Sequence, residues 1–180
     1  MKSITIRDQM TSRDKVQWAM KTAVGTMYLV ASKSVLHGVY WKEQDVPYVE
    51  DLSASKILSN TVEQMQQYLA GRRQDFDLPL DAEGGTAFQR QVWNELKGIP
   101  YGETCSYSDI ARNLKNDRAV RAVGTANGRN PFSIIVPCHR VIAANGTLAG
   151  YAGGMTIKEK LLQLEQSKTK SQTRVEGPKK

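Results

Sequence analysis

The chain has 180 residues, of which 40% are hydrophobic, enough for one ordinary domain or two small ones with a packed core. No apolar run approaches the roughly 18 residues needed to cross a bilayer. The first residues carry charges of both signs and no apolar stretch, so we expect no membrane association and a cytoplasmic protein. The net charge of +7 favours a polyanionic partner only weakly. Residues 168–180, which we expect to form a disordered tail, hold five basic residues and one acidic residue, hence +4 of that charge.

The chain contains two cysteines, Cys105 and Cys138, and two histidines, His37 and His139. In a reducing cytosol we expect both thiols to be free, although the count alone allows a disulfide between them. The four residues are scattered without a short ligand pair, which argues against a structural zinc site. We therefore expect neither a metal nor a cofactor, and we interpret His37 as a sheet-surface or hydrogen-bonded histidine.

The first half of the chain has segments rich in β-branched and aromatic residues, which predict strands. These segments are residues 16–20, 25–31 and 35–41. Apolar residues at helical spacing predict a helix over residues 53–70, with Ser53 or Ser55 as its cap and Gly71 at its end. We expect a small α/β domain over residues 1–85, made of an antiparallel sheet with a helix and closed by a glycine-containing linker.

The second half changes to short helices. Capping residues mark their starts at Thr86, at Ser106 and at either Asn116 or Asp117. Short helices with tight turns are the layout of a helix-turn-helix or winged-helix module, which either binds DNA or is purely structural. We place this helical, winged-helix-like domain at residues 86–167.

The third of these helices has two different faces. Its packing face consists of Ala119, Val120, Val123 and Ala126. The opposite face carries Arg118, Arg121, Ala122 and Thr125 at spacings of three, four and seven. A slim helix with a projecting arginine favours insertion into a nucleic-acid groove together with phosphate contact. The alternative is an ordinary solvated basic face.

A cysteine followed by a histidine marks the candidate catalytic segment. The β-branched residues 134–136 predict a strand or extended segment that presents Cys138 as a nucleophile. A thiol with a pKa of about 8.5 needs a base at neutral pH, and His139 is the candidate. Neighbouring side chains on a strand point to opposite faces, so their contact requires a bend or a water. Glu159 or Glu165 would orient the imidazole.

Several segments around this cysteine carry a family resemblance. The segment Pro137-Cys138-His139-Arg140-Val141-Ile142 follows Arg121-Ala122-Val123-Gly124 and Asn130-Pro131, and it precedes Gly150-Tyr151-Ala152-Gly153-Gly154 and Lys158-Glu159-Lys160-Leu161-Leu162. Over residues 86–166 the chain resembles the O6-alkylguanine-DNA alkyltransferase family, whereas the first half resembles it only in layout.

The resemblance implies a role for each matching residue. The catalytic set would be Cys138 as acceptor thiol, His139 as base through a water, Glu165 as orienting carboxylate and Tyr107 as hydrogen-bond donor to guanine N3. Arg121 would replace the extruded nucleotide, and we expect Ala122, Thr125, Arg118 and Arg129 to face the DNA with it. The substrate pocket would be formed by Val141, Tyr151, Ala152, Gly153 and Lys158. Asn130 would tie the helix-turn-helix to the active-site strand as a structural hinge.

The implied activity is repair of double-stranded DNA. A monomer would flip O6-alkylguanine, and also O4-alkylthymine, out of the duplex and transfer the alkyl group irreversibly to Cys138. The product is a thioether that water does not hydrolyse, so we expect one turnover per molecule. Two rivals stay open at this point: a lesion sensor of the same fold that transfers nothing, and a Cys-His hydrolase or acyl transferase that turns over repeatedly.

Overall fold

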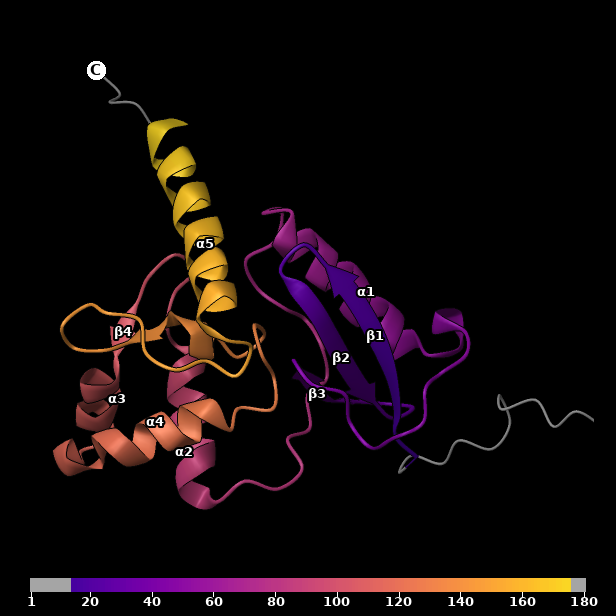
Figure 1. Ribbon diagram of the computed structural model, residues 1–180, viewed down its shortest axis with the longest axis horizontal. Helices are drawn as coiled ribbons and strands as arrows, with labels where there is room; N and C mark the ends of the chain where they lie inside the picture. The colour runs from indigo at the N-terminus through magenta and orange to yellow at the C-terminus, as the bar shows by residue number, and fades with distance from the viewer. Residues whose placement is uncertain (1–13, 176–180) are drawn as a thin grey trace, which may run out of the picture.

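The computed structural model describes residues 14–175, and its first half is built around a three-stranded antiparallel sheet. The strands are β1 (Val16–Thr22), β2 (Gly25–Ala31) and β3 (Leu36–Tyr40), in the order β1-β2-β3. Helix α1 (Lys56–Leu69) covers one face of the sheet (Figure 1). Ser55 caps this helix by accepting from the amide of Leu58, and Gly71 follows it with a φ of +68°. These elements confirm the predicted α/β unit.

The second half consists of helices with one short parallel strand pair. Its elements are α2 (Ala87–Lys97), β4 (Cys105–Ser106), α3 (Tyr107–Asn113), α4 (Val120–Gly128), β5 (Val141–Ile142) and α5 (Met155–Val175). Thr86 and Ser106 form the predicted caps, each as a reciprocal capping box. Trp93 donates from Nε1 to the carbonyl of Ala126 at 2.8 Å, which ties α2 to α4. The helical, winged-helix-like fold is thus confirmed.

The start of α4 differs from the prediction. A 3-10 turn over Asp117–Ala119 precedes the helix, and neither Asn116 nor Ala119 supplies a side-chain cap. Val120, predicted to pack, is instead 37% exposed, because the tighter 3-10 turn shifts the register of the faces by a fraction of a turn. Ala119, Val123 and Ala126 are buried as expected, and Asn127 at the end of the helix is buried with them.

The outer edge of β3 joins the two halves. At one end, the Leu36 amide donates to the carbonyl of Pro79 (2.8 Å). Further along, the Val39 amide donates to the carbonyl of Pro131 (2.8 Å), and the Ser133 amide donates to the carbonyl of Val39 (3.1 Å). The edge that would otherwise stay unpaired is therefore covered by the linker and by the segment that precedes Cys138.

The predicted strand over residues 134–136 is not formed. The segment is a turn in which Ile134 has a φ of +72°, and Cys138 begins a 3-10 turn over Cys138–Arg140. The reason is local: the Val136 amide bonds back to the carbonyl of Phe132, at 2.9 Å, instead of to a neighbouring strand. Ile134 and Val136 are buried in this turn and Ile135 is half-buried, so the apolar pattern marks burial and does not mark a strand.

The predicted disordered tail is wrong over residues 168–175. Helix α5 continues through Val175, while residues 176–180 lie outside the described residues. Thr169 donates to the carbonyl of Glu165 at 3.0 Å, and the Lys168 side chain lies against Gly71. Both contacts lie within the part of the chain that was expected to be disordered.

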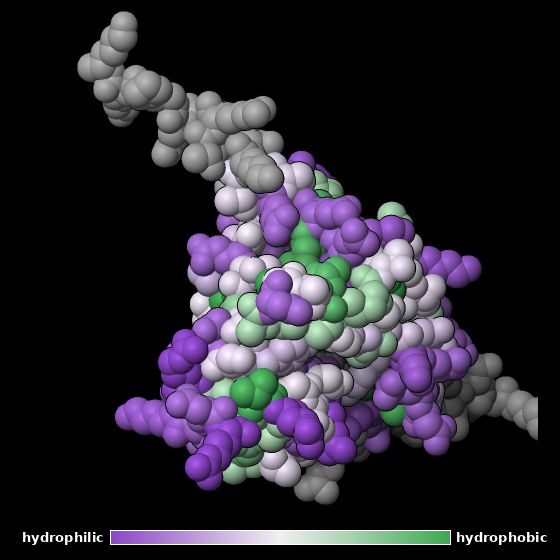
Figure 2. All heavy atoms as spheres, turned by 60° about the vertical axis from the view of Figure 1, so that its left-hand side comes forward, coloured by the Kyte–Doolittle hydropathy of each residue, from purple (hydrophilic) through white to green (hydrophobic). Residues whose placement is uncertain are grey.

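The surface of the second half is mostly polar. Figure 2 brings forward the side of the molecule that carries α3 and α4, where hydrophilic side chains surround a small hydrophobic area. Among the described residues no helix is long and apolar enough to span a bilayer. The predicted boundary near residue 85 stays a prediction, since buried residues of both halves form one continuous core.

Candidate active site

Cys138 lies at the start of a buried 3-10 turn and is only 3% exposed. Asn130 holds the turn in place by donating to the Val136 carbonyl at 2.8 Å and by accepting from the Phe132 amide at 3.0 Å. Asn127, at the end of α4, donates to the Cys138 carbonyl at 3.3 Å. The cysteine backbone is thus fixed to the helix that carries the predicted DNA-facing residues.

His139 is completely buried and pairs with a carboxylate. Its Nε2 lies 2.8 Å from Oε1 of Glu165, whereas Nδ1 has no hydrogen-bond partner among the described residues. A carboxylate at Nε2 favours the tautomer with the proton on that nitrogen, which leaves the Nδ1 lone pair free to accept a proton. Of the two carboxylates that the sequence offered, Glu165 makes this contact and Glu159 is exposed.

Glu165 is the centre of a buried charged cluster. Arg140 donates to both of its oxygens, from Nε to Oε2 and from Nη2 to Oε1, each at 2.9 Å. The Gly102 amide donates to Oε2 at 3.1 Å. Burial alone would raise the pKa of Glu165, but the hydrogen bonds and charges of His139 and Arg140 outweigh it and lower the pKa to about 2. Glu165 is therefore ionised throughout the physiological range.

The thiol of Cys138 is protonated at rest. Burial raises its pKa, and a hydrogen bond from Asn130 and the charge of Lys158 offset only part of that effect. Lys158 is itself buried, where it donates to the carbonyls of Val141 (2.5 Å) and Ala149 (2.6 Å), and burial lowers its pKa to about 8. Because the thiol is not a ready-made thiolate, it needs a base such as His139.

Two tyrosines flank the cysteine. Pairing of β4 with β5, at Cys105 with Val141, delivers Tyr107 next to Cys138, and the pKa of Tyr107 is raised by burial and by that neighbour. Tyr151 lies edge-on to His139, with ring centroids 6.5 Å apart. Both phenols keep their protons, so both are available as hydrogen-bond donors.

Trp41 packs against two of the predicted pocket residues, Tyr151 and Gly153. Its Nε1 donates to the Tyr151 hydroxyl at 3.3 Å. A Cβ at Gly153 would lie 2.8 Å from the indole, so a glycine is required at this close approach. The first half of the chain therefore contributes directly to the surroundings of Cys138. Ala152, between these residues, is exposed.

The predicted DNA-facing side chains are all exposed. Arg118 lies in the 3-10 turn before α4, Arg129 follows the helix, and Arg121, Ala122 and Thr125 lie on it. Gly124, on the same helix, lies close to the Tyr107 ring, since a Cβ there would be 3.8 Å from it. The exposed face thus lies next to the cysteine site, but its contact with DNA stays a prediction.

Sequence reasoning missed the contacts that Arg140 and Tyr68 make with Glu165. Arg140 stands beside His139 in the sequence, and only the 3-10 turn brings both side chains to one carboxylate. Tyr68 comes from α1 and donates to Oε1 of Glu165 at 2.5 Å. An aromatic residue on an apolar helix face is typical of the core, so no sequence signal marked it.

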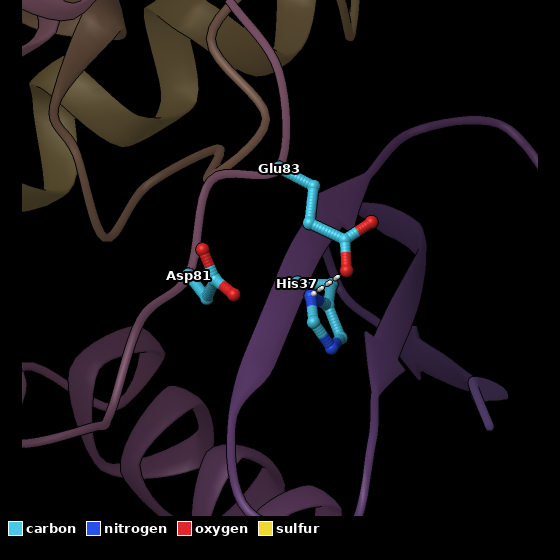
Figure 3. A group of neighbouring side chains, drawn as sticks. All are labelled: His37, Asp81 and Glu83. Carbon is cyan, nitrogen blue, oxygen red and sulfur yellow. Dashed lines mark ion pairs between the residues drawn. The ribbon is translucent and has the colours of Figure 1, made fainter. Parts of the chain in front are cut away.

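His37 also has a setting that the sequence did not predict. The imidazole is buried between Asp81 and Glu83 of the linker, and its Nδ1 lies 3.6 Å from Oε1 of Glu83 (Figure 3). Among residues 14–175, these three side chains form the only cluster whose potential ligand atoms lie close enough together to hold a metal ion. The other carboxylate oxygen of Glu83 pairs with Lys15, just before β1. The two contacts of Glu83, with Lys15 and with His37, therefore connect the linker to the sheet.

Comparisons with known proteins cover both halves of the chain. Residues 17–82 match the family model "6-O-methylguanine DNA methyltransferase, ribonuclease-like domain", and residues 87–167 match the corresponding "DNA binding domain". The methylated-DNA–protein-cysteine methyltransferase of Methanosarcina mazei is 46% identical over 77% of this chain and 88% of its own length. The chain belongs to this family.

Further members of the family agree with this assignment. The Methanosarcina acetivorans methyltransferase is 61% identical over 104 residues, which are 58% of this chain and 66% of that protein. A crystal structure of Mycobacterium tuberculosis O6-methylguanine methyltransferase superposes with a TM-score of 0.74 at 42% identity, covering 86% of this chain and 94% of that one. The same protein in complex with DNA matches at 44% identity and a TM-score of 0.74, over 83% and 92% of the two chains.

The ionised state of Glu165 predicts how stability depends on pH. Above its ordinary pKa of 4.5 the carboxylate is ionised in both folded and unfolded chains, and its stabilising contribution is complete. As the pH falls from about 5 to about 2, the unfolded chain takes up the proton first, so this contribution is progressively lost. Urea unfolding across this range should show the free energy of unfolding falling more steeply in wild type than in Glu165→Gln. Glu159→Gln, an exposed change on the same helix, should keep the wild-type slope; equal slopes in all three proteins would contradict the assignment.

Proposed function

We propose that this protein repairs alkylated DNA by transferring the alkyl group from O6 of guanine to Sγ of Cys138. The observation that carries the proposal is the buried cysteine beside a histidine whose Nε2 is held by Glu165 and whose Nδ1 has no hydrogen-bond partner in the part of the chain that the structure describes. Relatives bear the name methylated-DNA–protein-cysteine methyltransferase, and the tuberculosis relative has been crystallised with DNA, which supports DNA as the alkyl donor.

The reaction is a displacement at the alkyl carbon. Nδ1 of His139 takes the thiol proton through a water, the sulfur attacks the alkyl carbon, and the bond from that carbon to O6 breaks. The electron pair of the broken bond stays on guanine, and the Tyr107 hydroxyl donates its proton to N3, which neutralises the leaving purine. The proton that His139 took from the thiol is released to water, and Tyr107 regains a proton from water, so that both residues end in their starting states. The new S–C bond is a thioether without a carbonyl for water to attack. Each molecule therefore acts once and needs no cofactor.

The lesion reaches the site by leaving the helix stack. Unstacking costs a few kcal/mol, and a residue that fills the gap offsets that cost. Arg121 fills it in our proposal, because it projects from the exposed face of α4. Ala122 and Gly124 keep that face slim, while Arg118 and Arg129 contact phosphates and Thr125 lies against the backbone.

The flipped base is held by backbone groups. The carbonyl of Val141 accepts from Lys158, whereas the carbonyl of Cys138 accepts both from the side chain of Asn127 and from the amide of Val141. Since a carbonyl oxygen has two lone pairs, the Val141 carbonyl accepts from the guanine amino group, and the Cys138 carbonyl does so only by giving up its 3.3 Å contact with Asn127. Tyr151, Ala152 and Gly153 form the opposite wall, with amides directed at O6. O4-alkylthymine presents a similar alkoxy group on a smaller ring, and we propose it as a second substrate.

We further propose that the protein acts as a monomer in the cytoplasm. One helix and one pocket suffice to flip and hold one nucleotide. The acceptor must remain a reduced thiol, and both Cys105 and Cys138 are free. A lesion sensor without transfer is disfavoured because the acceptor cysteine is present. A hydrolase is disfavoured because a basic DNA-facing helix would serve no purpose in it.

Intact-mass measurement after incubation with a duplex containing O6-methylguanine tests the proposal. We expect a gain of one methyl group, capped at one equivalent per protein and located on the peptide that contains Cys138. Cys138→Ser should abolish the gain yet retain DNA binding, while Cys105→Ser should behave as wild type. An unchanged mass with intact lesion would refute the transfer, and repeated turnover would favour the hydrolase.

The role of Arg121 is tested by comparing two substrates. Arg121→Ala should slow repair of the lesion in duplex DNA by about ten-fold or more, since the gap left by a flipped base is no longer filled. Reaction with free O6-benzylguanine should stay at the wild-type rate, because a free base needs no flipping. Arg72→Ala, an exposed arginine after α1, serves as the charge-matched control and should leave both rates unchanged. Equal slowing of both substrates by Arg121→Ala would argue against flipping.

A further inference from the structure

We propose that Tyr68 of α1 is a positioning residue for the alkyl transfer, acting on His139 through Glu165; this inference rests on the proposed function. The tyrosine belongs to the first half of the chain, whereas the cysteine and its base belong to the second. Its side chain is completely buried, with the hydroxyl 2.5 Å from Oε1 of Glu165 and 3.3 Å from Nε2 of His139.

The direction of each proton follows from the charges. Burial and the neighbouring carboxylate raise the pKa of Tyr68 well above its ordinary value, so the phenol keeps its proton and must donate it. Glu165 is ionised, and its Oε1 is the strongest acceptor within reach. The Nε2–H of His139 donates to the same oxygen at 2.8 Å. The Tyr68 hydroxyl and Nε2 of His139 therefore lie 3.3 Å apart because both donate to the same oxygen, Oε1 of Glu165.

Sharing this oxygen limits the basicity of the histidine. Oε1 accepts from Tyr68, His139 and Arg140, and each donor withdraws charge from it. A carboxylate that is already satisfied stabilises a neighbouring imidazolium less, which adds to burial in keeping the pKa of His139 below its ordinary 6.5. His139 then stays neutral near pH 7, with Nδ1 ready to accept the proton of Cys138.

Removal of the Tyr68 hydroxyl should change the pKa of His139 in the opposite direction. Without the hydroxyl, Oε1 carries more charge and stabilises the imidazolium better, so the pKa of His139 rises. Because transfer needs neutral His139, the acid limb of the rate profile moves to higher pH. One hydrogen bond to a charged group corresponds to about one to two units in the pKa of that group, and we expect the part that reaches His139 through Glu165 to be about half a unit to one unit.

The neighbouring Tyr101 provides a matched control. Its ring packs edge-on against Tyr68, with centroids 6.0 Å apart, and faces the guanidinium of Arg140 at 5.6 Å. Its hydroxyl is buried and has no hydrogen-bond partner within residues 14–175. Tyr101→Phe therefore removes one buried hydroxyl next to the same cluster without removing a bond to Glu165.

The experiment follows the rate of reaction with free O6-benzylguanine from pH 5 to pH 9 in wild type, Tyr68→Phe and Tyr101→Phe. We expect the acid limb of Tyr68→Phe to shift upward and that of Tyr101→Phe to stay in place. In parallel, NMR titration reads the pKa of His139 directly, and it is simple to assign because His37 is the only other histidine. The titration requires no transfer, so it separates failure of this inference from failure of the proposed function.

Coupling to the carboxylate provides the second test. In a Glu165→Gln background, Tyr68→Phe should cause no further change in the rate profile, since its effect passes through that carboxylate. If Tyr68→Phe does not fold, an NMR spectrum of the wild-type protein provides the test instead. The Tyr68 hydroxyl proton should give a slowly exchanging downfield resonance close to the His139 ring protons. Absence of that resonance, or a rate lowered equally at every pH with an unshifted His139 titration, would overturn the inference and leave Tyr68 a packing residue.

Discussion

A buried carboxylate, Glu165, organises the rest of the site. An ion of this kind is costly to bury unless it is paired and fully hydrogen-bonded, and here Arg140, His139, Tyr68 and an amide satisfy both oxygens. The same bonds fix the tautomer of the imidazole and leave its other nitrogen free. The electrostatic requirement of one side chain therefore determines the chemistry that the neighbouring Cys138 is able to perform.

The same requirement explains why the first half of the chain is more than a support. It supplies Tyr68 to the carboxylate cluster and Trp41 to the wall beside Gly153. It also covers the segment before Cys138, because Val39 on the edge of β3 bonds to residues on both sides of Phe132. A buried, protonated thiol reacts only when the groups around it are held in the right positions. The contacts described above hold these groups in place from both halves of the chain.

Local sequence signals predicted the elements, and long-range contacts decided the rest. The helix caps at Thr86 and Ser106 depend on neighbouring residues only, so they were predictable. The segment around Ile134 reads as a strand, since no local pattern reveals that its partners lie within its own turn. The motif around Cys138 marked the proposed nucleophile and its proposed base. The contacts of Tyr68 and Trp41, by contrast, join residues that are 97 and 110 positions apart in the sequence. Such contacts leave no periodicity in a single sequence.

The central claim is that the alkyl group ends on Cys138 and remains there. The most direct measurement follows the carbon itself: the protein is mixed with a duplex whose O6-methylguanine carries a ¹³C-labelled methyl group, and the fate of that carbon is followed by NMR. We expect the label to appear as an S-methyl resonance of the protein, to survive unfolding and never to exceed one equivalent. Label released into solution as methanol, or found on Cys105, would contradict it.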